Sequence, residues 1–354
     1  MLSSGIRAQM LRDTTMLGLI KRGVDYVYNA QFDQANEVYM KIKQSYPNHP
    51  IPYLFRGLIT YWENYPLLPS SPVRQSYEKD MLTCIRLCEK KIHKIDEAEY
   101  LITNLGARGM LLLFYADNEI SMEVFSLASS TYQYVRRSFD FTGTYQDFYF
   151  ITGLYKYYRE AYPEAHPIYK TLAFLFPKGD RVEGLKELRL AASYAILLKA
   201  EAYSFLSGIY ISFENNFQQA YYYSKSLHEL YPQNIQYLAV YIKNLLLTKR
   251  YDEAEKIIKT SRSTHQNNYF QAQLTILEGI LYEKKYQNLQ LAQTYYLNGI
   301  RDAAPYGVFA GEYRAYAYFG LSRISAVNNE MQMKKKYRKQ ALDQATFENV
   351  NFDD

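Results

Sequence analysis

Small residues, tyrosines and prolines recur in this chain at intervals of about 34 residues. Gly57 follows Gly23 by 34 residues, and Ala254 follows Ala220 by the same number. Prolines such as Pro47 end a frame, because proline has no amide hydrogen with which to continue a helix. A repeat of this length is typical of helix pairs that stack on one another. The pattern therefore predicts an all-α array of antiparallel helical hairpins.

Residues 16–49 have the pattern of one complete hairpin. Gly23 in its first helix and Ala35 in its second are small, which allows the two helices to approach closely. Tyr26 and Tyr39 are expected to fill the space beside them. By the same reasoning, bulky side chains fit between adjoining helix pairs only where a glycine leaves room. The glycines in that position of the frame are Gly23, Gly57, Gly208, Gly279 and Gly320.

The repeat frame predicts four segments along the chain. Residues 1–138 contain N-terminal hairpins, the second of which is interrupted by a proline-rich insertion at 62–72. Residues 139–192 lose the frame, and we expect an irregular helical insertion there that is continuous with the array. Regular hairpins return over 193–347 and end in a lysine-rich helix that we interpret as a polar cap. Residues 348–354 are expected to form a frayed tail.

Tyrosine is unusually abundant: the chain has 39, against 18 phenylalanines and a single tryptophan, Trp62. A tyrosine ring can be buried while its hydroxyl stays in water, which suits a thin array with many half-exposed positions. The alternative is an aromatic surface that binds a ligand. The formal net charge is only +5 and the basic residues are scattered, so we do not expect a nucleic-acid partner.

The sequence lacks the common motifs of catalysis and cofactor binding. It contains no phosphate-binding GxxxxGK[ST] loop, no HExxH motif and no GxSxG motif, and its histidines are never three or four residues apart. Cys84 and Cys88 fall on one helix face, where we expect buried free thiols rather than a disulfide or a metal site. We therefore predict that the protein is not an enzyme and has no catalytic residue, bound metal or cofactor.

The segment Lys178-Gly179-Asp180-Arg181 precedes a predicted helix. The amide hydrogens at such a helix start are available to bind an anion. Alternatively, the Asp180 side chain accepts those hydrogens itself and caps the helix, which is the simpler prediction.

Neither a signal peptide nor a membrane-spanning segment is expected. The first ten residues lack an apolar core, and the most apolar stretch, residues 190–211, contains Lys199 and Glu201. The sequence as it stands predicts a soluble cytoplasmic protein, or an exported one if a leader has been removed.

Over residues 16–60 and 201–327 the chain resembles tetratricopeptide repeat (TPR) proteins. Between them stand Gly-Leu-Tyr-Lys-Tyr-Tyr at 153–158, Ala-Tyr-Pro at 161–163 and Pro-Lys-Gly-Asp-Arg-Val-Glu-Gly-Leu at 177–185. These runs resemble a bacterial branch of TPR proteins with a Gly-Asp-Arg-x-x-Gly-Leu insertion. They are more distantly similar to TPR proteins of the eukaryotic mitochondrial outer membrane and of lipid droplets. The resemblance implies a right-handed superhelix of hairpins that binds other proteins, and it implies no catalytic residue.

In TPR proteins the first helix of each hairpin lines a concave groove, and the resemblance implies which positions face it. The mixture is apolar and amide-bearing with two cations, Lys243 and Arg314, which favours an extended or helical peptide of acidic character. The alternative is that many of these residues pack against the neighbouring hairpin. The expected partner-binding positions are Phe205, Ile209, Gln236, Lys243, Gln273, Ile276 and Arg314, with Ala239, Leu246, Ile280 and Leu321 on the same face.

These observations predict a non-enzymatic scaffold that binds a partner protein or peptide whose identity the sequence does not specify. The alternative is a glycan- or lipid-binding module that uses the tyrosine-rich surface. Its local candidate is the cluster Tyr61–Trp62–Tyr65 beside the proline insertion, which would equally suit a buried corner of the second hairpin.

Overall fold

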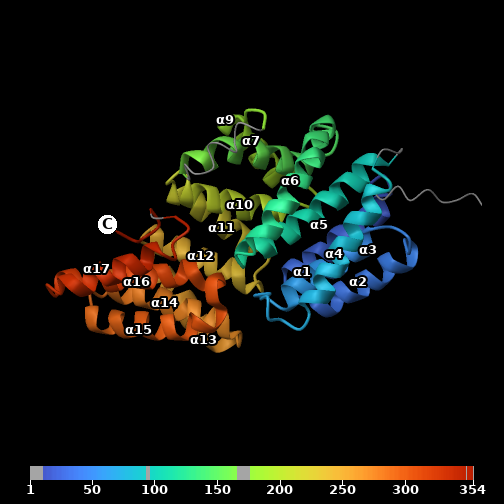
Figure 1. The fold of residues 1–354 in the computed structure, drawn as a ribbon. Coiled ribbons are helices and arrows are strands. Elements are labelled where there is room, and N and C mark those ends of the chain that lie inside the picture. The colour runs from blue at the N-terminus through green and yellow to red at the C-terminus, as the bar shows by residue number, and fades with distance from the viewer. Residues whose placement is uncertain (1–10, 93–95, 166–175, 348, 354) are drawn as a thin grey trace, which may run out of the picture. The chain divides into compact units, whose positions relative to one another are not determined.

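The computed structural model describes residues 11–92, 96–165, 176–347 and 349–353. Every regular element in these ranges is an α-helix or a short 3-10 helix, and none is a strand (Figure 1). The predicted all-α fold is therefore confirmed for the described part of the chain.

The chain divides into two compact units, Met1–Ala202 and Tyr203–Asp354. The division falls inside helix α10 (Lys199–Ser212). The segment boundaries predicted at residues 138 and 192 stay predictions, because a division into two units does not test them.

Helices in the first unit pack mainly against their neighbours along the chain. Each of α1 to α5 contacts the next helix, α3 also contacts α1 and α5, and α7 and α9 form a further close pair. This is the packing expected of stacked hairpins. The elements are α1 (Thr14–Tyr28), α2 (Phe32–Ser45), α3 (Ile51–Glu63), α4 (Arg74–Glu89), α5 (Glu97–Asp117), α6 (Ser121–Ser138), η1 (Phe139–Phe141), α7 (Phe148–Ala165) and α9 (Arg181–Tyr194).

The second unit has an inner and an outer layer of helices. Helix α14 contacts both α12 and α16, and Asn244 on α12 donates a 3.3 Å hydrogen bond to Ser207 on α10. These four helices form the inner layer, and α11, α13, α15 and α17 pack behind them (Figure 1). We call the surface turned away from the outer layer the inner face. The remaining elements are α11 (Phe217–Leu230), α12 (Ile235–Leu247), α13 (Tyr251–Thr264), α14 (Asn268–Lys284), α15 (Leu289–Ala303), η3 (Ala304–Ala310), α16 (Gly311–Val327) and α17 (Met331–Leu342).

Asparagines set the starts of four helices in the second unit. The side chains of Asn216, Asn234, Asn267 and Asn288 accept hydrogen bonds of 3.0–3.1 Å from amides in the first turns of α11, α12, α14 and α15. Asparagine is a preferred residue at this position because its side-chain oxygen satisfies an otherwise unpaired amide. The caps therefore fix where both the inner and the outer helices begin.

Glycines of the repeat frame do leave room for large side chains. A Cβ added at Gly57 would lie 1.7 Å from the Met81 side chain, and one at Gly320 would lie 2.2 Å from the Tyr296 ring. Tyr296 is fully buried, and its ring also fills the space beside Gly279. The glycine prediction is confirmed at these positions and at Gly23, which faces Phe55 and Val38.

The glycine prediction is wrong at Gly208. This residue is exposed, and a Cβ added there would have no atom within 4 Å. The neighbouring residues of α10 make the contact with α11 instead: Tyr210 stacks on Tyr223 with 5.7 Å between ring centroids, and the Ser207 hydroxyl donates to the Ala220 carbonyl. The contact between α10 and α11 therefore does not require a small residue at position 208.

The Gly-Asp-Arg-x-x-Gly-Leu motif joins α7 to α9. A Cβ at Gly184 would lie 2.6 Å from the Tyr157 amide nitrogen, and one at Gly179 would lie 2.2 Å from the Lys156 carbonyl oxygen. Asp180 Oδ1 accepts a 2.9 Å hydrogen bond from the Glu183 amide, so the aspartate caps α9 as the simpler prediction has it. The motif thus brings two helix backbones close together and starts the second of them.

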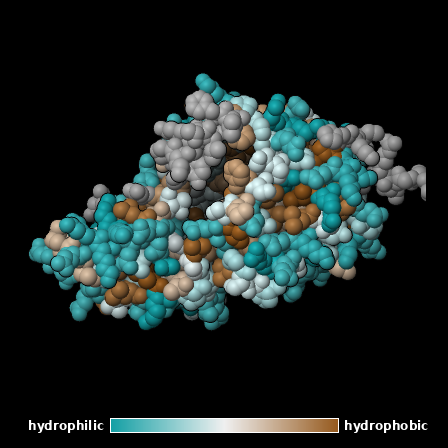
Figure 2. Space-filling view, in the orientation of Figure 1, coloured by the Kyte–Doolittle hydropathy of each residue, from teal (hydrophilic) through white to brown (hydrophobic). Residues whose placement is uncertain are grey.

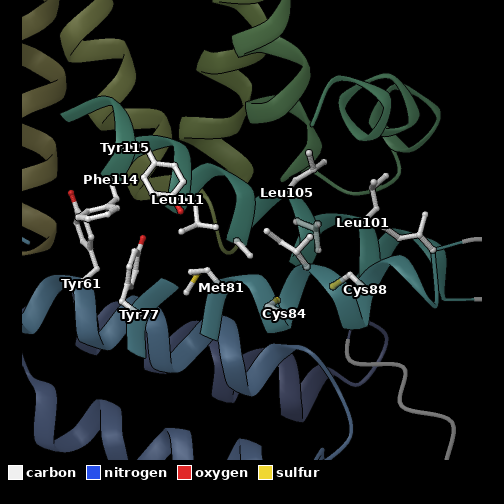
Figure 3. Close-up of a cluster of buried hydrophobic side chains, with 14 of the residues drawn as sticks. Tyr61, Tyr77, Met81, Cys84, Cys88, Leu101, Leu105, Leu111, Phe114 and Tyr115 are labelled. Carbon is white, nitrogen blue, oxygen red and sulfur yellow. The ribbon is translucent and has the colours of Figure 1, made fainter. Parts of the chain in front are cut away.

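Cys84 and Cys88 are free thiols in the core of the first unit. Figure 3 shows them on α4, pointing with Met81 toward Leu101 and Leu105 of α5. Burial, and after it the hydrogen bond with Cys84, raises the pKa of the Cys88 thiol well above its ordinary value. The prediction of buried free thiols is confirmed.

The C-terminal residues differ from the expected frayed tail. Val350 and Phe352 are only 4% and 8% exposed, because they pack onto the second unit. Residues 348 and 354 lie outside the described residues. The lysine-rich α17 before this tail presents a mostly hydrophilic surface, which forms the left end of the view in Figure 2.

Candidate functional site

The C-terminal tail, which we define as residues 344–347 and 349–353, crosses the inner face of the second unit. The Gln344 carbonyl lies beside Gly311 at the start of α16. Farther along, the Phe347 ring packs edge-on against Phe213 at 4.9 Å between centroids. The Phe352 ring packs edge-on against Tyr316 of α16 at 5.2 Å. The described residues of the tail form turns and bends without regular secondary structure, so the inner face holds an irregular segment.

Arg323 on α16 anchors the end of the tail. Its Nη1 lies 3.1 Å from Asp353 Oδ1 and donates to the Asn351 carbonyl. Its Nε and Nη2 donate to Glu283 of α14, at 2.6 and 2.9 Å. Because both ends of the guanidinium fork are engaged, Arg323 presents a fixed cation to the tail.

Glu283 is itself positioned by a residue of the outer layer, Tyr296 on α15. It is 8% exposed and accepts a 2.6 Å hydrogen bond from the Tyr296 hydroxyl. The Tyr296 ring fills the space beside Gly279 and Gly320. These two glycines of the repeat frame therefore allow Tyr296 to bind Glu283, which in turn positions the Arg323 guanidinium that contacts the tail. Burial, and after it the charge of Glu283, raises the pKa of the Tyr296 hydroxyl, which therefore stays a hydrogen-bond donor.

Asn349 fixes the middle of the tail to the far side of the inner face. Its side-chain amide donates a 3.2 Å hydrogen bond to the carbonyl of Ser212, at the end of α10, and another to the Asn215 side chain. The tail is therefore held both at α16 and at the turn between α10 and α11.

Two small hollows remain beside the tail. The larger holds about 80 Å³ and is lined by Leu246, Leu247, Lys249 and Lys284, by Phe217 and Tyr251 at the starts of α11 and α13, and by tail residues 349 and 351–353. The other holds about 10 Å³ beside Glu312 and Tyr316. Small-molecule sites need several hundred Å³, roughly 300 or more. With the tail in place, both hollows are therefore too small for a small-molecule ligand.

A salt bridge joins α12 to α16 at the edge of the smaller hollow. Lys243 Nζ lies 2.9 Å from Glu312 Oε1, and the Tyr316 hydroxyl donates to the same oxygen. Burial raises the pKa of Glu312, but the charge of Lys243 and the Tyr316 hydrogen bond outweigh it and hold that pKa below its ordinary value. The carboxylate is therefore ionised, and Lys243 is a neutralised cation rather than one available to an acidic partner.

The predicted groove residues do not form one surface. Ile209 and Ile276 are fully buried, and Ile276 occupies the space that a Cβ on Gly299 of α15 would need, so it faces the outer layer. For these two residues the alternative of packing between hairpins is the one observed. The same holds for Ala239, Ile280 and Leu321, whereas Leu246 is buried but also lines the larger hollow.

Three of the other predicted groove residues are partly exposed, whereas Gln273 is buried. Phe205, Gln236 and Arg314 are half-buried, and Gln273 is 2% exposed. Arg314 Nη1 lies 3.5 Å from the Gly307 carbonyl in η3. Within the described part of the chain, Gln236 Oε1, Gln273 Nε2 and Arg314 Nε are buried without a hydrogen-bond partner.

Sequence reasoning missed the residues that hold the tail: Arg323, Tyr316, Lys249 and the tail itself. A signal was present, because Val350 and Phe352 are large apolar residues in an otherwise polar end of the chain. Such residues are more often buried than solvated.

The Tyr61–Trp62–Tyr65 cluster lies in the first unit. Tyr61 is 3% exposed and belongs to the hydrophobic core, and the half-buried Trp62 and Tyr65 stack on each other beside it at 5.6 Å. The cluster therefore forms the corner of a hairpin, and no observation favours it as a sugar-binding surface.

In the described ranges, no group of three or more histidine, cysteine, aspartate or glutamate side chains is placed to hold a metal ion. None of the helices described is both long enough and apolar enough to cross a membrane.

No protein-family model matches the chain, and no curated protein has significant similarity to it. The functional assignment therefore depends on the fold and on the contacts of the inner face.

Proposed function

We propose that the protein is a non-catalytic interaction scaffold of the TPR type, and that the inner face of its second unit binds an extended segment of a partner protein. The observation that carries this proposal is the course of the tail. A segment without regular secondary structure lies across α10, α12, α14 and α16, held by two aromatic contacts, one charged contact and one amide contact. A surface that accommodates this segment has the dimensions and the chemistry to accommodate another of the same kind.

The shape and the polar groups of the site favour a peptide over other classes of ligand. Peptide grooves combine a pocket for an anchoring ring with polar groups that fix the backbone. Here Tyr316 supplies the ring contact, and Arg323 donates to a backbone carbonyl. The exposed Lys249, which borders the larger hollow, favours an acidic segment. The TPR assignment is supported by the recurring glycine frame and by helices that pack successively in pairs.

The test is a selection of twelve-residue peptides from a random display library on the full-length chain. The peptides obtained are then measured on two variants with matched chemistry. Leu247→Glu/Lys249→Glu places two carboxylates at the larger hollow, and Ile257→Glu/Lys259→Glu places two on the outer helix α13 at the same spacing. Residues 257 and 259 match 247 and 249 in type, one half-buried and apolar and one an exposed lysine.

We expect the inner-face variant to weaken the selected peptides by roughly tenfold or more, since it replaces attraction with repulsion at the binding surface. The outer-face variant should bind them as the original chain does. Equal binding by both variants would contradict the proposal, provided that both have the helical circular dichroism of the original chain.

A further inference from the structure

We infer that the C-terminal tail is a built-in competitor for the inner face, and that the natural partner carries a non-helical segment with the tail's own chemistry, a phenylalanine followed by an aspartate. This inference rests on the proposed function, because it names the ligand class and the regulation of the same surface.

The chemistry of the partner is taken from the two end contacts of the tail. Phe352 is 8% exposed with its ring against Tyr316, and the next residue, Asp353, reaches Arg323 at 3.1 Å. Phe352 has a φ of 58°, in the left-handed region, and the Asp353 amide donates to the Asn351 side chain at 2.9 Å, so the backbone turns at Phe352. This turn lets the phenylalanine pack on the inner face while the following carboxylate reaches the neighbouring cation. A segment with these two residues in this order would reproduce both contacts.

The contacts made by the middle of the tail indicate that the partner segment also carries an amide side chain. Asn349, three residues before Phe352, bonds to the turn after α10. An asparagine or glutamine at that distance would let a partner span the same width of the inner face.

The docked tail is held weakly enough to be displaced. Val350 and Phe352 are buried, but Asn349 and Asp353 are exposed, and solvent competes for their polar contacts. Against this, the tail is covalently attached, and a tethered segment competes at an effective concentration on the order of millimolar. A partner segment in solution must therefore overcome a local competitor, which lowers its apparent affinity until the tail is released.

The test uses the full-length chain and a fluorescein-labelled peptide with the sequence of residues 345–354, blocked at both ends, with binding measured by anisotropy. Phe352→Ala/Asp353→Asn removes the ring contact and the charge of the ion pair with Arg323, which should favour release of the tail. Leu342→Ala/Asp343→Asn is the matched control, because it makes the same two chemical changes at the end of α17, where both side chains are exposed. A second peptide with alanine in place of the residue equivalent to Phe352 tests the ring contact.

We expect the tail-released variant to bind the peptide at least tenfold more tightly than the original chain or the control variant does. The alanine peptide should bind at least tenfold more weakly to the released variant. Equal affinity for the original and the released chain would overturn the competitor inference. Equal affinity for both peptides would overturn the inferred partner chemistry.

The peptides from the display selection separate this inference from the proposed function. If they bind through the inner face but the tail-sequence peptide does not bind the released variant, the inference fails and the proposed function stands. If neither the selected peptides nor the tail-sequence peptide respond to changes on the inner face, both fail.

Discussion

Arg323 Nη1 donates a hydrogen bond of 3.1 Å to Asp353 Oδ1, although thirty residues separate the two in the chain. The same guanidinium is tied to Glu283, whose other partner is the buried Tyr296. A chain of contacts therefore connects the packing between two hairpins to the surface where the tail lies. The packing beneath the surface therefore positions the cation that binds the tail.

Loss of the Phe352 ring should expose the tail to proteolysis. In the docked tail, the Phe347 ring packs on Phe213, so it is not available to the specificity pocket of a protease. Phe352→Ala removes burial of about 1.5–3 kcal/mol, which corresponds to roughly tenfold or more in the population of the free tail. We expect limited chymotrypsin treatment to cut after Phe347 at least tenfold faster in this variant. An unchanged rate would mean that the ring does not hold the tail.

Gly320→Ala should destabilise the second unit. The added methyl group would lie 2.2 Å from the Tyr296 ring, which is fully buried and has no free space to move into. Overpacking of this kind costs about 1–3 kcal/mol. Gly208→Ala is the control, since nothing lies near it and alanine favours a helix interior by about 0.5–1 kcal/mol. Urea denaturation followed by circular dichroism should give opposite signs for the two variants, and the same sign would be evidence against the packing role of Gly320.

Gly184→Ala tests the crossing of α7 and α9. Its methyl group would lie 2.6 Å from the backbone nitrogen of Tyr157, and a backbone atom cannot move without separating the helices. We expect a loss of about 2–3 kcal/mol in the free energy of unfolding. Gly109→Ala, at an exposed and open position of α5, should instead be neutral or stabilising. If Gly184→Ala proved as stable as Gly109→Ala, the motif would not be a packing device.

Glu201 should make the stability of the first unit depend on pH. Burial raises its pKa from 4.5 to about 8, and the Tyr28 hydroxyl lies against its Oε1. Between these two values the folded chain keeps a proton that the unfolded chain has released. The stability therefore falls as the pH rises through this window, by up to about 1.4 kcal/mol for each pH unit.

Glu201→Gln should remove this part of the pH dependence. Urea denaturation at pH 5 and pH 8 measures it, and the exposed Glu229→Gln on α11 serves as the control. A pH dependence that is the same in Glu201→Gln as in the original chain would show that Glu201 does not keep its proton.

The repeat pattern was sufficient to predict the fold but not the site. Glycine and proline act through local geometry, which is why Gly23, Gly57, Gly279 and Gly320 identified the close contacts between helices. The prediction for Gly208 was wrong because the 34-residue spacing gives only a position along a helix. The contact between helices also depends on which neighbouring side chains are large. A period in the sequence thus predicts where helices lie more reliably than which way one residue points.

The site depends on long-range contacts that no local pattern contains. Lys243 has the sequence position of a groove cation, yet Glu312, sixty-nine residues later, neutralises it. The residues that hold the tail, Arg323 and Tyr316, are identified only once the tail is placed on the inner face. Arg323 and Tyr316 bind the tail because the tail folds back onto its own unit. The repeat period in the sequence does not predict this course of the chain.

The most direct test of the account is the environment of Phe352 in the intact chain. With 4-fluorophenylalanine incorporated at this position, fluorine NMR reports whether the ring is packed or free. The account predicts a resonance displaced from its position in urea, because the ring of Tyr316 lies edge-on at 5.2 Å. It also predicts that an excess of the tail-sequence peptide moves the signal toward the position of the free chain. A resonance that already coincides with that of the unfolded chain would contradict the account, because the inner face would then hold no segment.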